Sequence, residues 1–596
     1  MRHTSVLIGV LILCCGLGAA CTQGRGGDAL WQGVFVAEKS FGPQFRGPLT
    51  FHRMGDGWSA SIQGERAEVK RTPSGDGAHW AFAIEDQGRF EGHQSPNGGA
   101  IDGHWIQAPG EVEIYPFATP VRLEPASDAA FVGEVRPFPQ EVSLNISLTP
   151  DGDPRGVGAA KYQAFLRNPQ RNLGVFFRID AATVKGEEIR FVRSDGEELA
   201  VGRSVEPGQH FSLVFPRFGE TFDFRRRPRH DAPGFYPRRS TEAQVKLGRP
   251  VETGDGWKTA TPGAADLDEG LLRSWIQSLA TFEPTGLRQP YIHGVLLARG
   301  GQLVLEEYFH GHHRDMTHDS RSAGKSLASV LLGIAIRRGD LPDLDQPVYS
   351  FFGGVEAFEN PDPRKRRLTV RHLITMTSGL DCDDDDWETP GNEDRMQSQS
   401  EQTDWYRYAL DLPMVREPGE AGVYCTAGIH LAGGVIRAAT GKSLPRFFHE
   451  ELAEPLGMGH YQMNLSASDR GYMGGGIRLR PRDFLKLGQL FLDGGVWQGR
   501  RIVSEDWARE SAAGQATLYE DQDYGFAWWR RTDEIDRRTI DTFYASGNGG
   551  QLLFVIPELD TVAMIQAGNY SDGRTRNEFR DRFLRDFILP SALVKR

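Results

Sequence analysis

The chain has 596 residues, of which 25% are charged and 39% hydrophobic, and its formal net charge is -12. A chain of this length is too long for one hydrophobic core, so we expect at least two domains. The composition is that of an ordinary soluble globular protein, and the negative charge argues against non-specific binding of nucleic acid. After the N-terminal segment no apolar run is long enough to span a bilayer.

The first 21 residues, MRHTSVLIGVLILCCGLGAAC, have the layout of a secretory signal. Arg2 precedes an apolar core from Val6 to Leu13, and small residues stand directly before Cys21. The segment resembles a bacterial lipoprotein signal in which Cys21 would become the lipidated first residue, with Gly18 where a leucine is usual. We therefore predict export, to the periplasm or as a lipoprotein anchored to a bacterial membrane. The short apolar core disfavours a membrane-spanning anchor.

Residues 28–224 are predicted to form a β-rich accessory domain. Short runs rich in aromatic and β-branched residues are separated by Gly, Asn, Asp and Pro turns, and they include WQGVFVAE, LTFHRM, HWAFAIE, GVFFRID and EIRFVRS. The similar openings WQGVF at Trp31 and FVGEV at Phe131 suggest two repeats of an antiparallel barrel or sandwich unit. This region contains no catalytic constellation, so we expect it to serve as an accessory or packing domain.

The stretch FRRRPRHDAPGFYPRRS, from Phe224 to Ser240, interrupts the β pattern with basic residues and prolines. We assign residues 225–264 to a linker, and a basic interaction patch is the weaker alternative. Beyond it, helical and strand patterns alternate. The run HGVLLARGGQLVLEEYF contains two apolar stretches around Gly300 and Gly301, which is typical of a β-hairpin.

Two interpretations compete for RSAGKSLASVLLGIAI, residues 321–336. A phosphate-binding loop needs a glycine five positions before Gly324, but Asp319 stands there and would repel phosphate. In a Ser-x-x-Lys pair, a helix that begins near Ser322 would place the serine hydroxyl and the Lys325 amine one turn apart. Burial would lower the pKa of that amine and leave some neutral form able to take the serine proton.

Residues 326–338 are apolar on almost all sides and are followed by Gly339. They predict a buried helix with a glycine cap at its C-terminus. A serine at the N-terminus of such a helix lies near free backbone N–H groups, which stabilise a developing negative charge. This arrangement favours acyl transfer by Ser322 over phosphate binding.

Several motifs follow one another in a specific order: SRSAGKS, LTVRHLITMTSGLDC, VYCTAGIHLAGGVIRAATGKSL, YMGGGIRLRPRDFLKLGQLFLDGGVWQGRRIVSEDW, YGFAWW and ASGNGGQLLFVIPELDTVAMIQAGNY. Through them, residues 265–596 resemble the serine β-lactamase-like hydrolases, which include class C β-lactamases, penicillin-binding-protein-type peptidases and related esterases and amidases. The resemblance implies an α+β fold. We expect an antiparallel sheet flanked by helices, preceded by the all-β domain.

The resemblance also implies an acyl-enzyme mechanism on a small-molecule or peptide substrate, with no metal or organic cofactor. Ser322 would be the nucleophile, Lys325 its base, and Tyr424, with a depressed pKa, the proton shuttle to the leaving group. On spacing alone Tyr424 would be a half-buried structural aromatic. If Asn548-Gly549-Gly550 is the third motif, the N–H groups of Ser322 and Gln551 would form the oxyanion hole, with substrate lying along that strand.

Two positions depart from the family pattern. Thr426 stands where the family often has asparagine, so the amide that binds a substrate carbonyl is missing and a hydroxyl replaces it. Asn548 stands where a lysine or histidine is common, which removes a cation able to pair with a substrate carboxylate. We therefore expect an esterase, amidase or peptidase rather than a β-lactamase. A rival class is a non-catalytic, penicillin-binding-like protein that uses the fold for ligand binding or scaffolding.

The cysteine count leaves one pair in the folded part of the chain. Of five cysteines, Cys14 and Cys15 leave with the signal and Cys21 is the lipidation candidate. Cys382 and Cys425 remain and could pair in an oxidising compartment, which would tie the segment after the serine helix to the tyrosine loop. Two separate buried thiols are the alternative.

Two further clusters are expected to be solvated surface. The first lies in HGHHRDMTHD and comprises His310, His312, His313 and His318. It lacks a matching acidic motif, so zinc binding is the weaker alternative. The second is the run Asp383 to Asp386, which lacks the glycine and the spaced carboxylates of a calcium loop. No G-x-S-x-G elbow is present, which disfavours an α/β-hydrolase.

Overall fold

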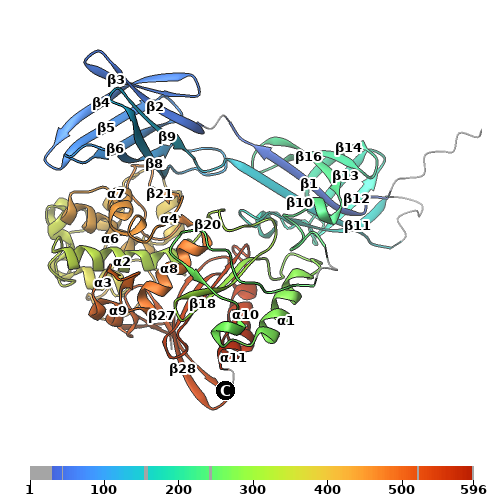
Figure 1. The fold of residues 1–596 in the computed structure, drawn as a ribbon. Coiled ribbons are helices and arrows are strands. Elements are labelled where there is room, and N and C mark those ends of the chain that lie inside the picture. Colours follow the sequence, from blue (N-terminus) through green and yellow to red (C-terminus); the bar gives the residue numbers. More distant parts are fainter. Residues whose placement is uncertain (1–29, 43–44, 153–158, 241–243, 520–521, 594–596) are drawn as a thin grey trace, which may run out of the picture.

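The computed structural model describes residues 30–42, 45–152, 159–240, 244–519 and 522–593. The predicted signal and Cys21 lie outside this range. The described residues form two β-barrels and a mixed α/β domain, and both barrels lie on the same side of that domain (Figure 1). None of the described helices has the length and apolar character needed to cross a membrane.

The first barrel is built from eight consecutive antiparallel strands. They are β2 (Gly47–Met54), β3 (Gly57–Ile62), β4 (Glu65–Ser74), β5 (Gly77–Ile84), β6 (Gly88–Gln94), β7 (Ile101–Gln107), β8 (Phe117–Ser127) and β9 (Ala130–Val135). The ring closes because β9 pairs with both β2 and β8. Alternate side chains point inward, and the Phe51 ring packs against those of Trp80 and Phe90 in the core.

The second barrel combines an early strand with seven later ones. They are β1 (Gly33–Ser40), β10 (Glu141–Pro150), β11 (Ala160–Arg167), β12 (Ala181–Lys185), β13 (Glu188–Val192), β14 (Glu198–Glu206), β15 (His210–Phe215) and β16 (Glu220–Arg227). Because β1 pairs with both β10 and β16, the first barrel is an insertion between β1 and β10. Trp31 and Phe131 thus lie in different barrels at non-equivalent positions, before the first strand of one and in the last strand of the other.

One predicted strand in this region is wrong. Four of the five aromatic and β-branched runs lie in strands, but GVFFRID, residues 174–180, forms the 3₁₀ turn η1 (Leu173–Val175) and a loop. Asn172 precedes the turn in a left-handed conformation, with φ of 51°. A methyl group on Gly174 would lie 2.0 Å from the carbonyl oxygen of Leu166 on β11. The turn therefore packs tightly against β11 and does not pair with it as a strand.

The predicted linker packs against its neighbours. Its basic start belongs to β16, and the 3₁₀ turn η2 (Arg229–Asp231) follows. Ala232 and Phe235 are buried against Val34 of β1. Farther along, Trp257 is buried in the core of the α/β domain. The segment is therefore an integral part of the structure on both sides.

The α/β domain contains a nine-stranded sheet. Its order is β17 (Lys258–Thr259), β19 (Gln302–Tyr308), β18 (Ile292–Arg299), β30 (Thr561–Ala567), β29 (Gln551–Ile556), β28 (Arg538–Gly547), β27 (Trp529–Ile535), β26 (Gln522–Tyr524) and β25 (Ala516–Leu518). All neighbours are antiparallel except β17 and β19. The hairpin predicted at Gly300 and Gly301 joins β18 to β19.

Helices cover both faces of this sheet, so the predicted α+β fold is confirmed (Figure 1). On one side lie α1 (Glu269–Ala280), α10 (Gly573–Phe583) and α11 (Leu589–Ala592). On the other lie α2 (Ser326–Arg338), α3 (Val370–Ile374), α6 (Thr426–Thr440), α8 (Pro481–Leu492) and α9 (Glu505–Ala512). The predicted buried helix is α2, and Gly339 caps it in the left-handed conformation with φ of 82°.

Both barrels contact the α/β domain directly. The short strand β21 (Met463–Asn464) pairs with β8 and so extends the first barrel. Arg446 of α7 (Leu444–Phe448) forms a 2.7 Å ion pair with Asp76 of the same barrel. From the second barrel, the Asn172 side chain donates to the Tyr570 carbonyl at 2.9 Å. The barrels are therefore fixed to the domain that carries the motifs.

Candidate active site

The predicted nucleophile and its base lie side by side at the N-terminus of α2. Ser322 and Lys325 belong to the 3₁₀ turn η4 (Arg321–Lys325), and α2 begins at the next residue. Residues i and i+3 eclipse in a 3₁₀ turn, and Lys325 Nζ lies 2.9 Å from Ser322 Oγ. The pairing expected from an α-helical turn is thus made by a tighter turn that leads into the helix.

Burial sets the charge state of Lys325. Its side chain is only 1% exposed, and this loss of solvent lowers the pKa of the amine. The carboxyl groups of Glu393 and Asp384 oppose that shift in part. The Nζ atom also lies 4.9 Å from the centre of the Tyr424 ring. A buried amine with a lowered pKa is more often neutral, which is the form a general base needs.

Tyr424 is at the site, but its predicted acidity is wrong. Its hydroxyl hydrogen-bonds Ser322, and its ring stacks on Trp529 with centroids 5.5 Å apart. Burial raises the pKa of the phenol, and the nearby carboxyl groups of Asp384 and Glu393 add to the increase. The hydrogen bond from Ser322 acts in the opposite direction without reversing the shift. Tyr424 therefore stays neutral and can relay a proton only through its hydroxyl.

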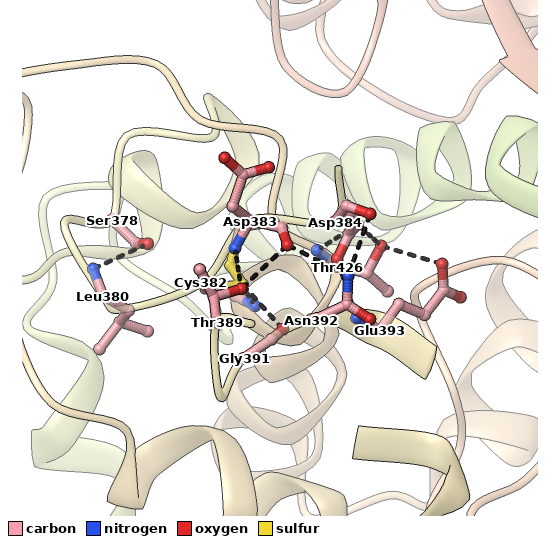
Figure 2. The surroundings of a disulfide bond; sticks show 12 residues. Ser378, Leu380, Cys382, Asp383, Asp384, Thr389, Gly391, Asn392, Glu393 and Thr426 are labelled. Atoms are coloured by element: carbon pink, nitrogen blue, oxygen red, sulfur yellow. Dashed lines mark hydrogen bonds between the residues drawn. A yellow bond between two sulfur atoms is a disulfide. The ribbon is translucent and has the colours of Figure 1, made fainter. Parts of the chain in front are cut away.

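Thr426, at the second-motif position, contacts two carboxyl groups. Its hydroxyl donates to Asp384 Oδ2, and its backbone N–H donates to the same atom at 3.0 Å. The hydroxyl also lies 3.4 Å from Glu393 Oε2, and the Tyr472 hydroxyl donates to the other oxygen of Glu393. Figure 2 shows Asp384, Glu393 and Thr426 meeting beside the disulfide. The Thr426 hydroxyl thus already donates its hydrogen bond to a group of the protein itself.

The aspartate run is only partly the solvated surface that the sequence predicted. Asp385 and Asp386 are exposed, but Asp384 is half-buried in the site, so the prediction is wrong for this residue. Burial and the neighbouring Glu393 raise the pKa of the Asp384 carboxyl, while Lys325 opposes the rise. The sequence held a signal for this placement, since the run directly follows Cys382.

Cys382 and Cys425 form a disulfide, with Cα atoms 5.4 Å apart. Cys425 is the N-cap of α6 and stands between Tyr424 and Thr426. Nearby, the backbone N–H of Asp384 donates to the Tyr424 carbonyl at 3.0 Å. The bond therefore ties the segment after the serine helix to the tyrosine loop, so of the two alternatives left open by the cysteine count, pairing is confirmed.

The third motif meets the nucleophile three residues earlier than predicted. A methyl group on Gly547, the last residue of β28, would lie 2.4 Å from Ser320 O and 3.0 Å from Ala323 N. Methyl groups on Gly549 and Gly550 would instead meet Tyr570 and Phe579. The close approach to η4 (Arg321–Lys325), which carries the predicted nucleophile and is called the nucleophile turn below, is therefore made by Gly547.

This contact changes the candidate for the second oxyanion donor. Gln551 begins β29, and its side chain donates to the Ala567 carbonyl at 2.6 Å. The residue that follows Gly547 is Asn548, whose side-chain oxygen accepts from the N–H of Ser571 at 2.9 Å. Its side chain is thus held by Ser571, and its backbone N–H replaces that of Gln551 as the candidate.

A glycine-rich segment for which the sequence predicted no role also borders Ser322. Gly475, with φ of 131°, lies so close that a methyl group there would be 2.3 Å from Arg321 O and 3.0 Å from Ser322 N. A methyl group on Gly474 would lie 2.4 Å from a side-chain carbon of Thr426. The signal for this contact was the run of three glycines, because only glycine permits such an approach.

A buried ionic network fixes the residues before Ser322. Asp319 accepts the backbone N–H of Arg321 at 2.8 Å and pairs with that side chain at 3.0 Å. Arg171 and Arg478 lie 3.6 and 3.7 Å from Asp319, and Glu113 pairs with both arginines. Burial alone would raise the pKa of Asp319, but the arginines hold it below its usual range. Glu113 precedes β8 and Arg171 follows β11, so each barrel contributes one residue.

The histidine cluster is mostly buried, contrary to the prediction of solvated surface. His313 is exposed and His312 is half-buried, but His310 and His318 are each 4% exposed. Their loop lies between the β18–β19 hairpin and the short strand β20 (His318–Asp319), which leads to the nucleophile turn. His293 of β18, which the sequence did not single out, lies beside them.

Comparison with a protein-family model matches the part of the chain that carries the site. The family model described as Beta-lactamase matches residues 279–584. The 6-aminohexanoate-dimer hydrolase of Paenarthrobacter ureafaciens is 24% identical over 306 residues, which are 47% of this chain and 74% of that protein. The monacolin J acid methylbutanoyltransferase of Aspergillus terreus is 32% identical over 151 residues, 23% of this chain and 35% of that protein.

Among solved structures, a penicillin-binding protein homologue from Caulobacter crescentus aligns with a TM-score of 0.42 and 15% identity. The alignment covers 56% of this chain and 99% of that one.

Proposed function

The chain belongs to the β-lactamase family, and on that premise we propose that it is a serine hydrolase whose Ser322 is acylated by an ester or amide substrate. The observation that carries the proposal is the 2.9 Å contact between Lys325 Nζ and Ser322 Oγ, with the Tyr424 hydroxyl hydrogen-bonded to the same serine. A binding module has no need of a buried amine and a phenol on one hydroxyl. A nucleophile needs that arrangement.

In the acylation step, neutral Lys325 takes the hydroxyl proton as Ser322 Oγ bonds to the substrate carbonyl carbon. The backbone N–H groups of Ser322 and Asn548 would donate to the resulting oxyanion. The proton then passes from Lys325 through the Tyr424 hydroxyl to the leaving group as its bond to carbon breaks. In deacylation, water gives a proton to the same pair as its oxygen bonds to the acyl carbon. The pair then passes that proton to Ser322 Oγ as the bond between Oγ and the acyl carbon breaks, so the acid product leaves and Ser322 and neutral Lys325 are restored.

The charges around Ser322 support a substrate whose acyl part has no obligatory carboxylate. The carboxyl groups of Asp384 and Glu393 lie beside Thr426, and a substrate carboxylate there would be repelled. At the third motif, the Asn548 side chain supplies no cation. The names of two relatives, a hydrolase and an acyltransferase, agree with acyl chemistry.

The test is hydrolysis of p-nitrophenyl esters of increasing acyl length by the wild type and Ser322→Ala. We expect kcat/KM to fall by about 10³-fold or more in the variant, because the nucleophile is lost. Ser274→Ala, an exposed serine on α1, serves as the matched control and should retain full activity. Equal activity in Ser322→Ala and the wild type would favour the rival, non-catalytic ligand-binding or scaffolding protein.

For the N-terminus, we propose export with lipidation at Cys21, supported by the signal layout of residues 1–21. In a bacterial host the full chain should then fractionate with membranes, and Cys21→Ala should release it from them. Mass spectrometry of the N-terminal peptide should find the lipid on Cys21. An unmodified Cys21 in the membrane-derived protein would contradict the proposal.

A further inference from the structure

Three histidines that the proposed mechanism does not use converge near the strand that leads to Ser322. They are His293 on β18, His312 in the loop after β19, and His318 on β20. One ring nitrogen of each lies within 4.8 Å of the other two. His293 Nδ1 and His318 Nε2 are 2.8 Å apart, and the rings of His293 and His312 stack with centroids 3.9 Å apart.

The surroundings keep these imidazoles neutral. Burial lowers the pKa of all three, and the neighbouring histidines lower those of His293 and His312 further. The pKa of His318 falls to about 4. His318 Nδ1 lies 3.2 Å from the Asp319 carbonyl, a contact that fixes the proton on Nδ1 and leaves Nε2 with a free lone pair. Neutral imidazole is the form that binds metals.

Hydrogen bonding among the rings does not account for the whole cluster. The 2.8 Å contact between His293 Nδ1 and His318 Nε2 is a single hydrogen bond and involves only two of the three rings. The stacking of His312 on His293 also adds a third nitrogen that the hydrogen-bonded pair does not need.

A cavity of about 250 Å³ opens beside the cluster, between the second barrel and the α/β domain. Its lining includes His312 and His318, together with Glu141 at the start of β10 and Tyr570. The cavity gives an ion a route to the imidazoles and leaves room for a further ligand. Structural and catalytic zinc ions are both four-coordinate, and three protein ligands with one open position is a common set.

The charged neighbours restrict which ions fit. Arg478 and Arg167 lower the histidine pKa values and would also repel a cation. Arg478 is compensated in part, because it pairs with Glu113 at 3.0 Å and lies 3.7 Å from Asp319. No carboxylate belongs to the cluster found among the described residues. Calcium and magnesium, which prefer oxygen ligands, are therefore disfavoured relative to ions with high affinity for imidazole.

We propose that His293, His312 and His318 bind one divalent transition-metal ion of the Zn²⁺ class, with the fourth coordination position facing the cavity. Tetrahedral zinc at 2.0–2.1 Å from each nitrogen separates its ligands by about 3.4 Å, so the 2.8 Å contact opens by roughly half an ångström on binding. The ion would tie β18, the histidine loop and β20 together. Since His318 precedes Ser322 by four residues, it would also fix the chain that enters the nucleophile turn.

The test uses the full chain freed of any affinity tag, stripped with EDTA and returned to metal-free buffer. Zn²⁺ uptake is measured by calorimetry and elemental analysis, and Co²⁺ is added as a spectroscopic probe of coordination. We expect about one equivalent of tightly bound ion per chain, a Co²⁺ spectrum of tetrahedral intensity, and a higher melting temperature with Zn²⁺. In His312→Ala the affinity should fall by about 100-fold or more, beyond the 10–100-fold typical of losing an outer-shell partner.

His313→Ala is the matched control, because His313 is exposed on the same loop and lies outside the cluster. It should bind Zn²⁺ as the wild type does. His312 is half-buried, so its substitution should leave the fold intact, and circular dichroism checks this. Uptake well below one equivalent by the wild type would overturn the proposal. So would equal affinity in His312→Ala and the wild type, or an equal loss in His313→Ala.

Discussion

Thr426 donates both its hydroxyl and its backbone N–H to one atom, Oδ2 of Asp384. A carboxyl group of the same chain therefore satisfies both hydrogen-bond donors of Thr426, the residue at the second-motif position. That carboxyl group has a raised pKa because it is buried next to Glu393. Against the lowering effect of burial, the same carboxyl group raises the pKa of Lys325, whose Nζ lies 2.9 Å from Ser322 Oγ.

Asp384→Asn should stabilise the protein at neutral and alkaline pH. Because the folded-state pKa of Asp384 lies above the unfolded value of 3.8, the folded protein holds this proton more tightly. That stabilisation is fully present below the unfolded pKa and is lost as the pH rises through the folded pKa. The amide oxygen of asparagine can accept the two bonds from Thr426 without ionising, while the 3.1 Å bond that the Glu393 N–H donates to the other carboxyl oxygen is lost at every pH. The melting temperature of the variant relative to the wild type should therefore be lowest at pH 4 and should rise towards pH 8.

Thermal unfolding followed by circular dichroism at several pH values checks this. Each kcal/mol of added stability should raise the melting temperature by roughly 1–2 °C in a cooperative unit of about 300 residues. Asp386→Asn, an exposed member of the same run, is the control and should show no such pH dependence. A pH-independent difference between Asp384→Asn and the wild type would contradict the assignment of the raised pKa to Asp384.

Lys325→Arg should lower kcat/KM for activated esters by about 10²- to 10⁴-fold, the range expected when a general base is lost. Arginine keeps the positive charge but does not deprotonate in proteins. Burial lowers the pKa of Lys325 from 10.5, so wild-type kcat/KM should rise with pH and level off below pH 10.5. The variant should lack that plateau. A variant with the wild-type pH profile would exclude Lys325 as the base.

Gly547→Ala should reduce activity by at least about 10-fold and destabilise the fold by roughly 1–3 kcal/mol, as overpacking does. The added methyl group would lie 2.4 Å from the Ser320 carbonyl oxygen, so β28 or the nucleophile turn must move. Gly248→Ala is the control, because a methyl group there meets nothing within 4 Å. Ester hydrolysis and urea unfolding measure the two effects. Unchanged activity in Gly547→Ala would show that the close approach of Gly547 to Ser320 is not needed for activity.

Reducing the Cys382–Cys425 disulfide should lower the free energy of unfolding by about 4 kcal/mol on the loop-entropy model. The bond closes a loop with a sequence separation of 43, and that loop includes the aspartate run. Urea unfolding with and without dithiothreitol checks the effect. A variant with both cysteines changed to serine should be insensitive to the reductant. An equal response to dithiothreitol in that variant would show that another group is responsible.

The features that short stretches of sequence encode were predicted well. The spacing of Ser322 and Lys325, the apolar run and Gly339 led to the nucleophile turn and to α2. Gly300 and Gly301 led to the β18–β19 hairpin. Each of these rests on contacts between residues close in the chain, where helix caps and turn chemistry act directly.

The features that depend on distant contacts were not predicted. The insertion of the first barrel follows from pairing between β1 and β10, which are about a hundred residues apart. Three glycines in ASGNGGQ satisfy the same motif, and only packing on Ser320 shows that Gly547 makes the approach. The histidine cluster required His293, which belongs to a different strand from His318.

The most direct test of the account is intact-protein mass spectrometry after incubation with a serine-reactive fluorophosphonate, on the wild type and on Ser322→Ala. We predict one phosphonyl adduct on the wild type, mapped to Ser322 by peptide analysis, and none on the variant. A parallel incubation with a penicillin should give no stable adduct, because the site lacks the cation that would hold its carboxylate. Labelling of both proteins at another residue, or of neither, would contradict the claim that Ser322 is an activated nucleophile.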